Sequence, residues 1–94
     1  MIDRFHRLLE LLPAHSSLWL ESAKARQGLE SIIIDQYEID DCLHYTGQIV
    51  IEQVNDNLVA TKTWDKGSYP VPEEEIHGWI RLIEEVYQSE QNGA

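Results

Sequence analysis

The sequence predicts an α+β fold: a small antiparallel β-meander of three to four strands, flanked by an N-terminal and a C-terminal helix. Apolar residues recur at helical spacing at both ends of the chain, residues 30–64 are rich in β-favouring residues, and an asparagine-rich break divides that stretch. With 94 residues the chain supports one core, so we expect a single domain over 1–94. Residues 90–94 are polar and aperiodic, and we expect a flexible tail there.

The first predicted element is a helix over residues 2–12. Its apolar residues recur at steps of three and four and therefore share one face: Ile2, Phe5, Leu8, Leu9 and Leu12. Pro13 ends the helix because its ring clashes with a continuing helical turn. We expect His6 and Arg7 to face away from the apolar stripe or to flank it.

Residues 16–28 fit two structures. Ser17 is a suitable N-cap and Gly28 a suitable stop, which slightly favours a helix. The segment Leu18-Trp19-Leu20 suits the opening of a strand instead. In that case the meander gains a fourth strand.

A first strand is predicted around Ile32-Ile33-Ile34. This β-branched run is too short for a buried helix, and Tyr37 and Ile39 extend it.

Residues 48–54 and 58–64 form the clearest strand pair. Asn55-Asp56-Asn57 lies between them, and these residue types tolerate the positive φ angles of tight hairpins. Thr61 and Thr63 suit an exposed face of the second strand. The side chains expected to supply buried contacts are Val50, Val54, Leu58 and Ala60.

A helix over residues 73–89 is the last predicted element. Pro72 suits the first helical position, and Glu73-Glu74-Glu75 suit the positive end of the helix dipole. The apolar stripe at helical spacing comprises Ile76, Trp79, Ile80, Ile83, Val86 and Tyr87. The residues expected to face solvent are Glu74, His77 and Arg81.

The net charge of −10 is unevenly distributed along the chain. Residues 1–27 hold four basic and three acidic residues, a net charge of +1, whereas residues 28–94 hold three basic and fourteen acidic residues, a net charge of −11. Such a field repels phosphate backbones and attracts basic partners. We therefore expect no direct nucleic-acid binding and a protein partner with a basic surface. The alternative is that the acidity only keeps a small protein in solution.

Two groups of residues are candidates for partner binding. The first is the densest acidic cluster outside a helix start: Asp35, Glu38, Asp40 and Asp41. In a strand Asp35 and Glu38 point to opposite faces, and the ligand spacing of a calcium loop is absent, so we predict no metal site. The second group is Trp64 and Tyr69, aromatic residues near a strand end, where such residues often anchor interfaces. The alternative is that Trp64 closes the hydrophobic core.

No catalytic or cofactor motif is present in the sequence. It lacks a phosphate-binding glycine loop, a nucleophile elbow and a dinucleotide fingerprint. Cys42 and His44 would share a strand face but lack a third group to orient them, and the four histidines lack zinc-ligand spacing. We therefore predict that the protein is not an enzyme and holds no cofactor. The lone cysteine, the absence of a secretory signal and the absence of a membrane-spanning apolar run predict a cytoplasmic location without a membrane partner.

Together these observations favour a small acidic protein-binding module. In size, acidity and layout the chain is similar to immunity proteins, enzyme inhibitors and other small antagonists, with which it shares no motif. Its carboxylates would dock on a basic surface of a partner, including a nucleic-acid-binding surface whose natural ligand they mimic. The alternatives are a structural or assembly subunit or adaptor, including a homodimer, and thirdly a small metal-dependent enzyme.

Overall fold

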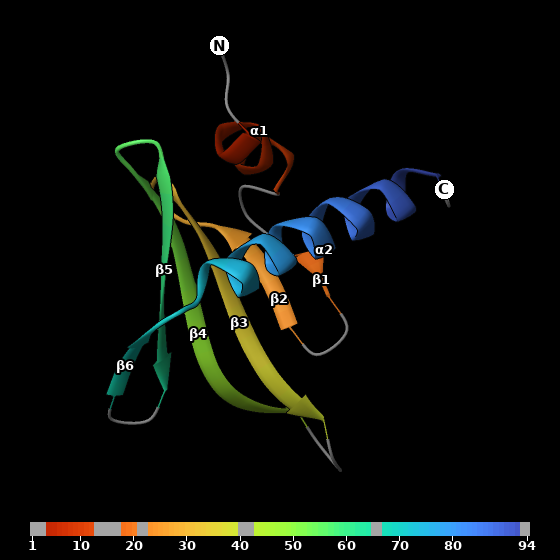
Figure 1. The fold of residues 1–94 in the computed structure, drawn as a ribbon. Coiled ribbons are helices and arrows are strands. Elements are labelled where there is room, and N and C mark those ends of the chain that lie inside the picture. Colours follow the sequence, from red (N-terminus) through yellow and green to blue (C-terminus); the bar gives the residue numbers. More distant parts are fainter. Residues whose placement is uncertain (1–3, 13–17, 21–22, 40–42, 65–66, 93–94) are drawn as a thin grey trace.

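The computed structural model describes residues 4–12, 18–20, 23–39, 43–64 and 67–92, which form one antiparallel sheet and two helices (Figure 1). The six strands pair in sequence order, β1-β2-β3-β4-β5-β6. The α+β class, the antiparallel meander and the two flanking helices are confirmed, whereas the strand count exceeds the three to four predicted. The elements are α1 (Arg4–Leu11), β1 (Leu18–Trp19), β2 (Ala23–Gln27), β3 (Ser31–Ile39), β4 (Leu43–Val54), β5 (Asn57–Trp64), β6 (Gly67–Pro70) and α2 (Glu73–Asn92).

The additional strands come from two segments. Residues 18–19 and 23–27 form β1 and β2, so the helix that the capping signals slightly favoured is wrong. Ala23 and Ala25 alternate with half-buried Lys24 and Arg26, and all five residues of β2 pair with β3. This long-range ladder outweighs the weak local preference for a helix. The fourth residue of β6, Pro70, suits an edge strand because it has no N–H to donate.

The β4–β5 hairpin turns where the sequence predicted. Asn55 and Asp56 adopt left-handed φ angles of 49° and 67°, and Val54 pairs with Asn57 to close a two-residue loop. Asparagine and aspartate tolerate this backbone conformation, and its twist matches that of the flanking strands. The predicted hairpin is therefore confirmed, with Asn57 as the first residue of β5.

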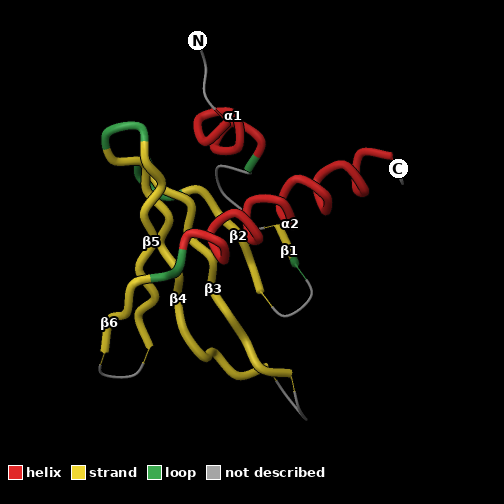
Figure 2. The backbone as a smooth tube through the Cα atoms, viewed as in Figure 1, coloured by secondary structure: helices red, strands yellow, loops and turns green. Residues whose placement is uncertain are grey.

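A bulge interrupts the pairing of β3 with β4. Gln36 pairs with Gly47 and Tyr37 pairs with Tyr45, which leaves Thr46 as an extra residue on β4. An extra residue on one strand bends the ladder and increases its twist. Both strands curve along their length and continue beyond the part of the sheet that α2 crosses (Figure 2).

The two faces of the sheet differ. The inner face carries Ile32, Ile34, Ile49 and Ile51, each 0% exposed, and both helices lie on this side (Figure 1). Among the described elements, none covers the outer face. From the helices, the side chains buried in the same core include Phe5, Leu8, Ile76, Ile80 and Ile83.

The sequence prediction of which β4 and β5 side chains are buried was partly wrong. Ala60 is buried and Leu58 half-buried, as expected, but Val50 is only half-buried and Val54 is 47% exposed. In the run Ile49-Val50-Ile51 every residue is apolar, so the residue types do not reveal which of them face inward. Thr61 and Thr63 are exposed, as predicted.

The helices agree closely with their predicted positions. Helix α2 extends three residues beyond the predicted end at 89, so residues 90–92 are helical and the flexible tail predicted over 90–94 is wrong there, while residues 93–94 lie outside the described part of the chain. The α2 residues Glu74, His77 and Arg81 are exposed as expected. Helix α1 buries Phe5, Leu8, Leu9 and Leu12 and exposes His6 and Arg7. None of the helices in the described ranges is long and apolar enough to cross a membrane.

Candidate protein-binding surfaces

The acidic cluster predicted from the sequence does not form one surface in the described residues. On the outer face, Asp35 accepts a hydrogen bond from Arg26 Nε at 2.9 Å and another from Gln48 Nε2 at 3.1 Å. Its side chain is only 13% exposed, so its charge is largely compensated within the fold. Glu38 is exposed and pairs in the ladder with His44. Because Glu38 is three residues from Asp35, it points to the opposite face.

Asp40 and Asp41 lie outside the described residues, so their places in the cluster stay predictions. Cys42, the possible partner of His44, lies outside them as well.

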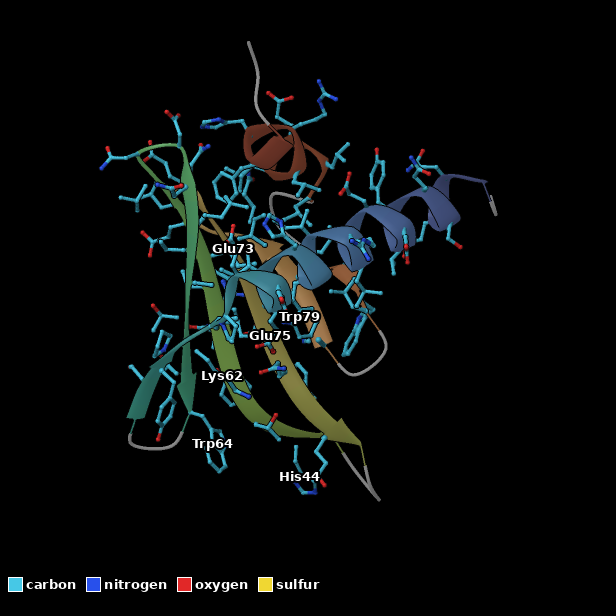
Figure 3. The ribbon with its side chains drawn as sticks, in the orientation of Figure 1. His44, Lys62, Trp64, Glu73, Glu75 and Trp79 are labelled. Atoms are coloured by element: carbon cyan, nitrogen blue, oxygen red, sulfur yellow. The ribbon has the colours of Figure 1, made fainter. Side chains whose placement is uncertain are left out.

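Trp64 and Tyr69 lie near each other at the free end of the β5–β6 ribbon. Each is 54% exposed, and Trp64 projects beyond the part of the sheet that α2 covers (Figure 3). Gly67 pairs with Trp64, and a Cβ atom on Gly67 would come within 2.5 Å of the Tyr69 hydroxyl. Glycine at this position therefore allows the Tyr69 ring to lie over the strand directly across from Trp64. By strand alternation these two aromatic side chains are on the inner face, whereas the carboxylate of Asp35 is on the outer face.

The outer face carries an aromatic cluster that the sequence reasoning missed. The ring centroids of Trp19 and Tyr37 are 6.1 Å apart, and those of Tyr37 and Tyr45 are 5.8 Å apart. Lys24 Nζ lies 4.8 Å from the Trp19 centroid and 5.1 Å from the Tyr37 centroid, within cation–π range of both. In the sequence, Ala23 and Ala25 alternate with longer polar residues. This alternation was the one local indication that the segment is a strand with a buried face and a more exposed face.

The phenol of Tyr45 has a perturbed acidity. Partial removal from water raises the pKa of Tyr45 above its ordinary value of 10.0, and the negative charge of Asp35 acts in the same direction. Arg26 partly offsets both effects. Tyr45 is nevertheless 57% exposed, so the outer aromatic cluster offers apolar area to a partner.

Three adjoining hollows surround the β4–β5 hairpin, and we call them together the hairpin groove. The first hollow has a volume of about 320 Å³ and lies between β5 and the start of α2. The second hollow has a volume of about 270 Å³ and shares Asn57, Leu58 and Glu73 with the first. The second reaches Phe5 on α1 and shares it with the third hollow, of about 300 Å³. The apolar side chains that line the groove include Phe5, Leu58, Ala60, Val71, Ile76 and Ile80.

The charged side chains around the hairpin groove have one sign. Four exposed acidic residues are among those that line it: Glu30, Glu52, Asp56 and Glu73. None of the lysines and arginines in the described part of the chain does so. His77 Nε2 lies 3.5 Å from Glu73 Oε1, an ion pair that exists only when the imidazole is protonated. Acidic residues gathered around a concave surface concentrate negative potential there.

The sequence did not indicate this groove. Its four carboxylates come from the β2–β3 connection, β4, the hairpin turn and α2, and only the folded chain brings them together. Within the described ranges no group of three or more histidine, cysteine, aspartate or glutamate residues is arranged to hold a metal ion.

No protein-family model, curated protein or solved structure matches this chain.

Proposed function

We propose that this chain is a small protein-binding module that docks on a basic surface of a protein partner. The hairpin groove carries the proposal, because its lining is partly apolar, includes four exposed acidic residues and includes no described lysine or arginine. The apolar part of such a lining supplies affinity by burial, whereas surrounding residues of one charge sign select partners of the opposite sign and speed their association. An inhibitor, immunity protein or other antagonist of an enzyme with a basic surface fits this description.

The charge distribution supports the same reading. Helix α2 carries six glutamates and one arginine, a net charge of −5, and its first turn lies at the groove. On the outer face Asp35 is paired with Arg26, and Lys24 lies against two aromatic rings. Among the described residues, the uncompensated negative charge is therefore concentrated on the hairpin and helix side.

The test compares two variants with the same net charge. The groove variant carries Glu30→Gln, Glu52→Gln, Asp56→Asn and Glu73→Gln, and asparagine keeps the left-handed backbone of position 56 accessible. The control variant neutralises four exposed glutamates that do not line the groove: Glu10, Glu38, Glu85 and Glu90.

Wild type and both variants are used to capture partners from the native cell lysate at low and high salt, and the proteins are identified by mass spectrometry. We expect a basic protein that is released by salt, is retained by the control variant and is lost by the groove variant. The opposite pattern, or equal retention by both variants, would contradict docking through the groove.

The outer face favours a second candidate, self-association as a structural subunit. Trp19 is 47% exposed and Tyr45 57% exposed on a sheet face that none of the described helices covers. Large exposed apolar patches often mark protein contacts. Sedimentation velocity across a concentration series tests this candidate. A dimer that Tyr45→Lys dissociates would support it, whereas a monomer at the highest concentration reached would reject it.

A further inference from the structure

Within the described part of the chain, the edge of β5 is open where it borders the hairpin groove. Strand β6 pairs only with Thr61–Trp64, and the next contact on that side is the hydrogen bond that Val71 N–H donates to the Ala60 carbonyl at 3.0 Å. Along an antiparallel strand the N–H and C=O groups of one residue point to the same side, and successive residues alternate between sides. Leu58, two residues from Ala60, therefore directs both of its backbone groups toward the open edge.

The hairpin register leads to the same conclusion independently. In a two-residue hairpin the residues that flank the loop, here Val54 and Asn57, exchange hydrogen bonds with each other. The next residue, Leu58, pairs with Gln53 at a position without ladder hydrogen bonds, so its backbone groups point away from β4. No strand in the described part of the chain stands opposite Leu58 on the other side.

From this arrangement we infer that the hairpin groove binds an extended segment of the partner, which adds as a short strand to the edge of β5 at Leu58. The inference rests on the proposed function and specifies the chemistry of the partner. Strand addition uses main-chain hydrogen bonds for affinity and alternate side chains for specificity. The segment would exchange two backbone hydrogen bonds with Leu58, in line with β6.

The hollow beside this edge determines the side chains of the segment. Its volume of about 320 Å³ lies between Leu58 and Ala60 on one side and Val71 and Ile76 on the other, which suits an apolar side chain. Glu73 borders this hollow, and its side chain is 82% exposed at the start of α2 (Figure 3). Asp56 lines the adjoining hollow. We therefore expect an apolar residue with lysine or arginine residues nearby.

Basic side chains would supply the missing counter-charge. In the structure Glu73 lies next to His77, whose positive charge requires protonation. A lysine or arginine from the bound segment would pair with Glu73 at any pH near neutrality. Binding should therefore weaken with salt, because exposed charge pairs are screened.

The experiment uses a display library of short random linear peptides, selected first against the wild-type protein. We expect enrichment of peptides that combine an apolar residue with lysine or arginine. Binding of a synthetic enriched peptide is then measured by fluorescence anisotropy. Glu73→Lys should weaken it roughly tenfold or more, whereas Glu85→Lys, an equal charge change at an exposed position of the same helix outside the groove, should have a much smaller effect.

N-methylation of the peptide backbone tests strand addition itself. Methylating the amide that faces Leu58 should weaken binding roughly tenfold, about the loss expected for one hydrogen bond. Methylating the neighbouring amide, which points away from β5, should not. If peptide binding depends on Glu73 but is affected equally by methylation of either amide, strand addition is overturned and the proposed function is left intact. Failure to enrich any such peptide would also overturn this inference, and the lysate comparison would still decide whether a folded basic partner docks in the groove.

Discussion

Ile80 on α2 is the position at which the predicted core can be tested most directly. Its side chain is 1% exposed and belongs to the same buried cluster as Ile76 and Ile83. Ile80→Ala removes three methyl or methylene groups, worth roughly 2.4 kcal/mol at about 0.8 kcal/mol each. A residual cavity adds to this loss, so we expect the free energy of unfolding to fall by about 3–4 kcal/mol, inside the usual range for such substitutions.

This loss is large for a chain of 94 residues. At roughly 0.05–0.15 kcal/mol per residue its total stability is about 5–14 kcal/mol. A loss of about 3–4 kcal/mol should lower the melting temperature by about 12–32 °C, because each kcal/mol shifts a domain of this size by about 4–8 °C.

The assay is urea unfolding followed by tryptophan fluorescence, with half-buried Trp79 on α2 as one reporter. The matched control is Arg81→Ala at the next, exposed position, which should stay within about 0.5 kcal/mol of wild type. The denaturant slope should be the same for both variants, because neither changes the surface exposed on unfolding by much. If Ile80→Ala costs less than about 0.5 kcal/mol, then this face of α2 does not pack in the core.

Three further predictions concern the outer face and metal ions. Asp35→Asn should lower the free energy of unfolding by about 0.5–1.5 kcal/mol, because it weakens the hydrogen bonds with Arg26 and Gln48. The loss stays small because the Arg26 side chain is 41% exposed, so water already weakens its ion pair with Asp35. Glu38→Gln should change the free energy of unfolding by less than about 0.5 kcal/mol in the same urea titration, and equal effects would contradict the different environments of the two carboxylates. Because the pKa of Tyr45 is raised, the folded state keeps the phenolic proton to higher pH than the unfolded state does. The free energy of unfolding should therefore fall as pH rises above 10.0, and it should fall less steeply in Tyr45→Phe. Identical alkaline stability profiles of the two proteins would refute this. Millimolar calcium, magnesium or manganese should leave the melting temperature unchanged, since the described residues include no metal-binding cluster, and a marked rise would reveal a site.

The sequence alone determined those parts of the fold that depend on local chemistry. The stripe of Ile76, Ile80 and Ile83 has helical spacing and follows a proline and three glutamates, so α2 could be predicted almost to its boundaries. Asn55 and Asp56 suit a backbone conformation that most residues avoid, so the hairpin turn was equally predictable. In both cases neighbouring residues carry the information.

The tertiary structure decided what depends on distant residues. The capping residues around 18–27 suit a helix, and only pairing with β3 makes this segment two strands. The run Ile49-Val50-Ile51 fits either face of a sheet, and only packing against the helices places Ile49 and Ile51 inside. The partner of Asp35 is Arg26 on a neighbouring strand, which residue types along β3 do not reveal.

The hairpin groove depends most strongly on tertiary structure. Its carboxylates are separated by up to 43 positions, from Glu30 to Glu73, and converge because α1 and the start of α2 both pack near the hairpin. The open edge at Leu58 arises because the chain leaves the sheet after Pro70 and begins α2 at Glu73, before β6 can cover all of β5. Charge and apolarity are properties of the sequence, but their meeting at one edge is decided by where the strands end and how the helices cross the sheet.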